Sequence, residues 1–170
     1  SMAKKKITKK KKALTKTVAP RSSRKAVSEK RDRETSSKII KLADDVTRSG
    51  LAGREPKVEI PIRAVSNMKW NKRRGILEMG GNTQQRSLFN LSQARKFMQT
   101  VLLAKGCKDL VEAQKTLSLR GMYYMSLHMI EGTREKTFDD QSESDSILED
   151  LEVTIDGLRE ELHVFAKKRG

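Results

Sequence analysis

The chain has 170 residues and a mass of 19.3 kDa, which allows one domain with a tail and excludes a large multidomain enzyme. Its formal charge of +15 is unevenly distributed, because the first 41 residues hold 16 of the 37 basic side chains and only 3 of the 22 acidic ones. A single cysteine rules out an internal disulfide, and the longest apolar runs are far too short to cross a bilayer. The composition therefore predicts an intracellular protein with no membrane anchor.

Residues 1–36 form a basic arm. They carry many lysines and arginines and few large apolar side chains, so burial cannot offset an ordering entropy of about 1–2 kcal/mol per residue. We expect this segment to be disordered and the folded domain to cover residues 37–170. The arm fits a salt-sensitive contact with nucleic acid, and it equally fits a solubilising tail.

The first half of the domain combines one helix with short strands. Ser36 is a candidate N-cap for an amphipathic helix that ends before Gly50. Three β-rich runs follow, at residues 58–62, 65–70 and 75–79. The polar stretch between the last two runs predicts a hairpin turn at residues 71–75.

From residue 91 onward the pattern is helical. It predicts a long helix over 91–106, a short helix over 108–114, a helix over 117–130 and an acidic helix whose apolar stripe runs from Ile147 to Leu158. Several helices beside a small antiparallel sheet indicate an α+β, mostly helical domain. This combination favours a helix-turn-helix derivative over a doubly wound nucleotide-binding fold.

The segment 117–130 contains both tyrosines of the chain. On a helix, Tyr123 falls on the continuous apolar face and belongs to the core. Tyr124 lies about 100° away and shares its stripe with Arg120 at i−4 and His128 at i+4. A tyrosine hydroxyl beside a guanidinium can attack a phosphodiester, because the cation stabilises charge on both the phosphate and the phenolate. The same spacing also fits a half-buried surface tyrosine without a catalytic role.

Two blocks of sequence resemble a known family. Residues 117–124, LSLRGMYY, resemble the (T/S)-L-R-(D/E)-x-(Y/F)-Y motif in the A subunit of type IIB DNA topoisomerases, the topoisomerase VI group, and of their meiotic double-strand-break relatives. Residues 138–144, FDDQSES, followed by ILEDLE at 147–152, resemble the next block of the same protein. The similarity extends from about residue 55 to residue 165 and leaves the basic arm outside.

The resemblance implies a CAP-like winged-helix domain and a role for two residues. In that family the second tyrosine of the motif attacks DNA and becomes linked to the 5′ end, which assigns the nucleophile to Tyr124. Arg120 corresponds to the motif arginine that assists at the phosphate. Gly121 stands where the family usually has Asp or Glu, and this departure bears on motif-helix packing and DNA contacts.

The resemblance also implies components outside this chain. The family holds Mg²⁺ on a Toprim domain, works as a homodimer of A subunits and binds ATP on a separate B-type ATPase subunit. No Toprim sequence is present here, so we expect the chain alone to bind DNA and to cleave poorly or not at all. We expect no metal site in the chain itself, because its acidic residues suit the solvated face of a helix: Asp139, Asp140, Glu143, Asp145, Glu149, Asp150 and Glu152.

The acidic segment from 139 to 161 would repel phosphates, so the contacts with double-stranded DNA must come from other residues. We expect them at the hairpin turn, beside the tyrosine and at the tip of a wing whose first strand is 162–165, the wing being cut off at the end of the chain. The candidates are Lys72, Arg73, Arg74, His128, Lys167, Lys168 and Arg169.

The sequence therefore predicts the tyrosine-bearing part of the A component of an ATP-dependent type IIB DNA topoisomerase, which breaks one duplex and passes another, associated with the DNA of a prokaryotic cell. One alternative is a non-catalytic winged-helix protein that binds DNA or a partner. A second alternative, an RNA-associated protein, depends on the basic arm alone and predicts that A-form RNA is preferred over duplex DNA.

Overall fold

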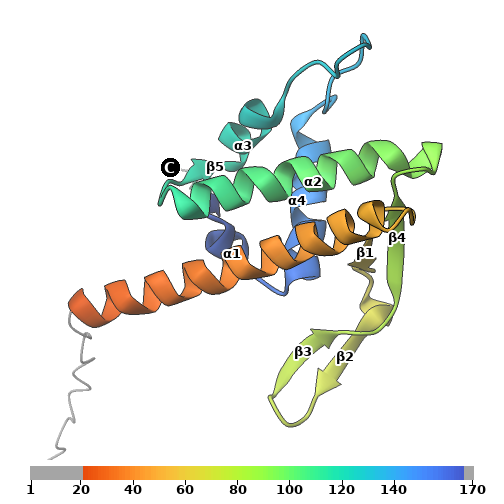
Figure 1. Cartoon of the computed structure of the whole chain (residues 1–170). Coiled ribbons are helices and arrows are strands. Elements are labelled where there is room, and N and C mark those ends of the chain that lie inside the picture. The colour runs from red at the N-terminus through yellow and green to blue at the C-terminus, as the bar shows by residue number, and fades with distance from the viewer. Residues whose placement is uncertain (1–20, 167–170) are drawn as a thin grey trace, which may run out of the picture.

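A computed structural model describes residues 21–166, and their side chains from residue 25 onward (Figure 1). The elements follow in the order α1 Arg21–Leu51, β1 Lys57–Pro61, η1 Val65–Asn67, β2 Met68–Asn71, β3 Ile76–Met79, β4 Thr83–Ser87, α2 Leu91–Glu112, β5 Leu117–Ser118, α3 Leu119–Ser126, α4 Gln141–Ile155, η2 Arg159–Leu162 and β6 Val164–Phe165. The expected α+β, mostly helical class is confirmed.

The main core lies between α2, α3 and α4, with α1 packed alongside α2 (Figure 1). Its fully buried side chains include Leu103 of α2, Met122 of α3 and Leu151 of α4. Phe138, just before α4, is also completely buried. Three helices around one apolar centre agree with the expected helix-turn-helix type of domain. No helix in the described part of the chain has the length and apolarity needed to span a bilayer.

The strands form three separate pairs. β1 and β4 are antiparallel, with Glu59 opposite Gln85, and β2 and β3 form the expected antiparallel hairpin. β5 and β6 are parallel. The strand expected to open the wing is β6, which is two residues long and pairs with β5 just before α3 begins. Val58 and Ile60 of β1 pack with Phe97 of α2 in a second, smaller core.

An ion-pair network joins the β1–β4 pair to α4. Arg86 of β4 donates to Asp150 of α4, and both side chains are only 6% exposed. The loop residue Arg63 donates to the other oxygen of Asp150 at 2.7 Å and also pairs with Glu149. Thr100 of α2 accepts from Arg86 at 2.8 Å. The network explains how a polar strand, TQQRS, is held against the core.

The expectation of disorder up to residue 36 is wrong for residues 21–36, which form the first half of α1. Two i,i+4 ion pairs, Lys25–Glu29 and Lys30–Glu34, support this half of the helix. Asp32 anchors it to the body, because His163 Nε2 lies 2.9 Å from one carboxylate oxygen and Gln114 Nε2 donates to the other at 2.8 Å. Residues 1–20 lie outside the described part of the chain.

The helices expected at 91–106 and 108–114 are one continuous helix, α2. Gly106 does not end it, because this glycine lies at the contact with α3, where a Cβ would stand 2.8 Å from Met122 Cε and 3.0 Å from Met125 Cε. At the start of α2, Leu91 is 96% exposed, whereas Cys107 and Leu110, beyond the expected end of the first helix, are buried.

Candidate active site

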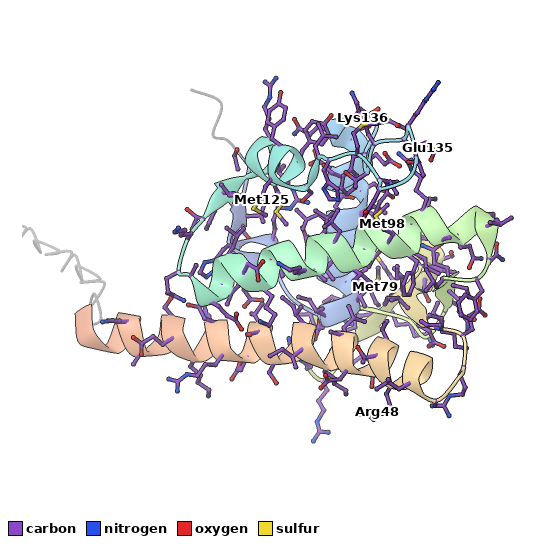
Figure 2. The ribbon with its side chains drawn as sticks, turned by 45° about the horizontal axis from the view of Figure 1, so that its top comes forward. Arg48, Met79, Met98, Met125, Glu135 and Lys136 are labelled. Atoms are coloured by element: carbon purple, nitrogen blue, oxygen red, sulfur yellow. The ribbon has the colours of Figure 1, made fainter. Side chains whose placement is uncertain are left out.

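The helix that carries both tyrosines is short and well capped. Ser118 is its N-cap, and the Ser118 hydroxyl accepts from the Gly121 amide at 3.0 Å. The helix rests on α2 at Gly106, where the absence of a side chain lets Met122 and Met125 approach closely. Figure 2 shows Met125 between α3 and α2. The cap and the contact with α2 therefore fix the position of α3 on the body.

Tyr124 and Arg120 form the expected pair on the outer side of α3. Arg120 Nη2 donates to Tyr124 Oη at 3.3 Å, and the guanidinium carbon lies 5.7 Å from the centre of the ring. Tyr124 is 56% exposed, so the hydroxyl is open to a large ligand. The cation beside the hydroxyl would stabilise the negative charge of a phosphate that approaches it.

Tyr123 takes the inward position predicted from the helical period. It is partly buried and packs against the main core, and its ring centre lies 5.2 Å from that of Tyr124. The two adjacent tyrosines therefore have different surroundings. Tyr123 helps to hold α3 on the core, whereas Tyr124 presents its hydroxyl to solvent.

His128 does not share the stripe of Tyr124, because α3 ends at Ser126 rather than at residue 130. The backbone of His128 instead pairs with Thr137, whose amide donates to the His128 carbonyl at 2.9 Å and whose hydroxyl accepts from the His128 amide at 3.1 Å. The segment between α3 and α4 is thus a hairpin-like loop with a bridge between Met129 and Lys136. Figure 2 shows Glu135 and Lys136 on this loop. His128 is exposed at its base.

The basic residues of the β2–β3 turn lie far from Tyr124. α3 and the hairpin project from opposite sides of the body, with α1 and α2 between them (Figure 1). Lys72 and Arg73 are exposed, and Arg74 is exposed but pairs with Glu78 at 2.6 Å. The structure therefore does not bring these candidates together with the tyrosine. Lys167, Lys168 and Arg169 lie outside the described residues.

Known proteins similar to this chain are topoisomerase subunits. Residues 95–164 match the family model of the type IIB DNA topoisomerase. The A subunit of type 2 DNA topoisomerase 6 from Pyrococcus horikoshii is 41% identical over 133 residues, which cover 78% of this chain and 35% of that protein. The corresponding protein of Methanocaldococcus jannaschii is 34% identical over 145 residues, which cover 85% and 38%. The matched part of this chain is a domain of the type IIB topoisomerase A-subunit family.

The chain spans about a third of the length of the curated topoisomerase subunits that it matches. The family model covers most of α2 and continues through α3 and α4 to β6, so it includes Arg120 and Tyr124. It does not include the β2–β3 hairpin. The tyrosine helix thus lies in the part of the chain that the topoisomerase family model describes, and the hairpin lies outside it.

The prediction of a solvated acidic face holds for Asp139 and Asp140, which are exposed, but it is wrong for Glu143, Asp150 and Glu152, which are buried or half-buried and paired. Glu143 accepts from Gln99 at 2.8 Å and pairs with Arg95, and Glu152 pairs with Arg159 at 2.6 Å. Burial alone would raise the pKa of Glu143, but hydrogen bonds from Gln99, the Asp139 amide and Arg95 lower it. These carboxylates therefore neutralise arginines of the fold.

These pairings determine whether the carboxylates of α4 could bind a divalent cation. Among residues 21–166, no cluster of three or more His, Cys, Asp or Glu side chains is arranged to hold a metal ion. The carboxylates nearest to one another on α4 already accept from Arg63, Arg86, Arg95 or Arg159. The carboxylates of α4 do not suit Mg²⁺, which needs free carboxylate oxygens.

Proposed function

We propose that Tyr124 is the nucleophile with which a type IIB DNA topoisomerase opens a duplex. Its hydroxyl oxygen attacks a backbone phosphorus and gives up its proton. The bond from phosphorus to the 3′ oxygen breaks, and that oxygen leaves as a hydroxyl after taking up a proton. The 5′ end is then joined to Tyr124. One phosphodiester replaces another, so the reverse attack by the 3′ hydroxyl reseals the strand.

The observation that carries this proposal is the hydrogen bond of 3.3 Å from Arg120 to the hydroxyl of an exposed tyrosine, on the motif helix of the matched family region. Arg120 balances the negative charge that develops on the tyrosine oxygen and on the phosphate in the transition state. The exposed ring leaves room for a duplex. Tyr123, packed against the core, serves as a positioning residue.

The rest of the reaction requires other parts of an assembly. We propose that Mg²⁺ is bound by a Toprim-type domain, that ATP is bound by a B-type ATPase subunit, and that two A subunits together cut both strands and pass a second duplex. No step of the attack described above depends on a metal held by α4, because Glu143, Asp150 and Glu152 of this helix pair with arginines. On this proposal the chain is associated with the DNA of the cell.

Covalent trapping tests the proposal. The chain, assembled with a Toprim-containing A-type partner and a B-type ATPase, is incubated with end-labelled duplex and magnesium and is then denatured. We expect label from the 5′ side of the break to migrate with the protein. Tyr124→Phe should abolish the adduct, whereas the matched control Tyr123→Phe should retain it. An adduct that survives Tyr124→Phe would assign the nucleophile to another residue.

The contribution of Arg120 can be separated from that of the tyrosine. Arg120→Ala should lower the cleavage rate roughly 100- to 1,000-fold, as expected when one preorganised donor to a developing oxyanion is removed. DNA affinity should fall far less. An equal loss in both quantities would make Arg120 a binding residue only.

One observation favours a second candidate function, a winged-helix protein that binds DNA or a partner without cleaving. Gly121 replaces the acidic residue usual in the motif. In that case, Tyr124→Phe would change no activity of a fully assembled, DNA-bound complex, and no covalent adduct would form with the wild-type chain.

A further inference from the structure

The β2–β3 hairpin has one apolar face. Residues directly opposite each other on antiparallel strands point to the same side, and the pairs Met68–Met79 and Trp70–Leu77 therefore place four apolar side chains together. Trp70 is 58% exposed, Leu77 61% and Met68 44%. The end of the hairpin nearest the turn is thus an apolar surface that the described part of the chain leaves open to solvent.

The hairpin is held rigidly at both ends. At its base, the buried Asn67 side chain donates to the carbonyls of Ile62 and Asn82, each at 2.9 Å, and accepts from the Asn82 amide at 3.1 Å. At its tip, Asn71 Oδ1 accepts from the amides of Arg73 and Arg74. The apolar face is therefore presented by an ordered ribbon.

Basic side chains border this face. The one carboxylate of the hairpin, Glu78, is occupied by Asn71 at 2.8 Å and by Arg74 at 2.6 Å. Within the described residues, Lys69, Lys72 and Arg73 have no ion-pair partner. The tip and one edge of the hairpin thus carry uncompensated positive charge next to exposed apolar side chains.

We propose that the hairpin is a second duplex-DNA contact, in which Trp70 and Leu77 pack into a groove while Lys72 and Arg73 bind the flanking phosphates. A two-stranded ribbon fits a DNA groove, and apolar side chains bordered by cations are suited to contact base and sugar edges between two phosphate backbones. The positive charge disfavours a basic protein surface as the occupant. The inference rests on the proposed function only in taking duplex DNA as the ligand.

The position of the hairpin defines what this contact does. The helix α3, which carries Tyr124, and the hairpin project from opposite sides of the body (Figure 1), so the hairpin does not contact the phosphate that Tyr124 attacks. It binds either DNA that bends around the body or another duplex. The hairpin contact should therefore add affinity without taking part in bond breakage.

Trp70 is the only tryptophan of the chain, so its fluorescence reports on the hairpin directly. The full chain is titrated with unlabelled duplex while tryptophan emission is followed, and in parallel the anisotropy of a labelled duplex is measured. We expect a saturable change in emission with the same midpoint as the anisotropy. DNA binding without any change in emission would overturn the proposal.

Substitutions show which side chains of the hairpin contact the duplex. Trp70→Ala should weaken duplex binding roughly five- to tenfold, the lower range for loss of one aromatic contact with a base, and Trp70→Phe should restore most of it. Lys72→Ala with Arg73→Ala should flatten the slope of log affinity against log salt by about 1.8. The matched control Lys105→Ala with Lys108→Ala removes the same charge from α2, away from the hairpin, and should leave the emission change in place.

The outcomes separate this inference from the proposed function. A Tyr124 adduct with a silent Trp70, or with unchanged affinity in Trp70→Ala, would refute the hairpin contact and leave the nucleophile assigned. A DNA-dependent Trp70 signal without any adduct would support the hairpin contact and refute the assignment of Tyr124 as the nucleophile. If the emission changes with a B-type ATPase or with A-form RNA but not with duplex DNA, the hairpin binds a different class of macromolecule and the proposal is wrong.

Discussion

Gly121 occupies the third position of α3, where the Ser118 cap makes its hydrogen bond. An acidic residue at this position can return a hydrogen bond to the backbone amide of the cap residue and complete a capping box. Gly121 cannot do so, and it also carries the entropic cost of glycine in a helix. Gly121, in place of the acidic residue usual in the motif, therefore weakens the N-terminus of α3.

Gly121→Glu should stabilise the chain by about 1 kcal/mol, because it adds helix propensity and the missing half of the capping box. A Cβ at this position would lie 3.3 Å from Ser118 Oγ and 3.4 Å from Leu117 Cδ2, so part of the gain is offset by close packing. Urea unfolding measures the difference.

Gly121→Ala is the control for this prediction, since it has the same Cβ contact without the carboxylate. A Glu variant no more stable than the Ala variant would show that the capping box does not form.

The side-chain roles on α3 were predictable because they depend on the helical period alone. Tyr123 faces the core and Tyr124 pairs with Arg120, as the spacing indicates. His128 was not predictable in the same way. The pairing of its backbone with Thr137, nine residues away, competes with another turn of helix, and the local pattern holds no sign of that partner.

At the scale of elements, the first half of α1 depends on contacts distant in sequence. His163 lies with Nδ1 at 2.9 Å from the Lys115 carbonyl and Nε2 at 2.9 Å from Asp32, so both ring nitrogens face acceptors. Both can donate only in the imidazolium form, which then also pairs with the Asp32 charge. This cluster joins α1, the end of α2 and the turn before β6.

His163→Asn should loosen residues 25–36 of α1. Asparagine suits the left-handed backbone of residue 163, where φ is 60°, but it is too short to keep both contacts of the ring. Hydrogen exchange of the amides in this half of α1 should accelerate roughly tenfold, as expected for loss of about 1–2 kcal/mol of local stability. Exchange in α4 should not change, and a uniform acceleration would contradict the local role.

The same cluster predicts an acid-sensitive helix. Burial raises the pKa of Asp32, but hydrogen bonds from Gln114 and His163 and the charge of His163 together lower it below the ordinary value. Ionised Asp32 thus stabilises the fold fully above its unfolded pKa of about 3.9, and this stabilisation is lost as the pH falls through the lower folded value. Protection of residues 25–36 should decline over this acidic range, and Asp32→Asn should remove that pH dependence.

The buried pair of Arg86 and Asp150 makes a second prediction at this scale. Asp150→Asn should destabilise the chain by about 3–5 kcal/mol, because it leaves Arg86 buried without its counter-charge. The double variant Arg86→Met with Asp150→Leu should lose less, since both charges are removed together. Thermal unfolding compares the two, and a double variant that is less stable than Asp150→Asn would contradict this account.

The elements recovered from the sequence are those with a local signal. Apolar period and turn residues predicted α4, β1, the β2–β3 hairpin and, wrongly divided at Gly106, α2. β4 was missed because TQQRS is polar, and Arg86 becomes buried only by pairing with Asp150 of a distant helix. The first half of α1 was assigned to a disordered arm because the prediction used only its charge and its apolar content. The contact between Asp32 and His163, 131 residues apart, leaves no signal in local composition.

At the scale of the whole molecule, Cys107 reports on global unfolding. The residue is completely buried in the main core, and burial raises the pKa of its thiol to about 12. Since only a thiolate reacts readily, native protein should resist thiol reagents at neutral pH. Labelling should accelerate only across the urea transition, with the same midpoint as circular dichroism. Rapid labelling without denaturant would show that the core opens locally.

The contact at Gly106 links that core to the proposed chemistry. A methyl group there would stand 2.8 Å from Met122 Cε, and the Met122 side chain is buried, so it would have to move within the core beneath α3. Any shift of α3 that accommodates this change would move the Tyr124 hydroxyl, although Tyr124 and Arg120 themselves are unchanged. A residue without a side chain thereby acts as a spacer that sets the reach of the nucleophile. Selection on catalysis would then act on Gly106 as strongly as on residues that touch DNA, although Gly106 takes no part in the reaction.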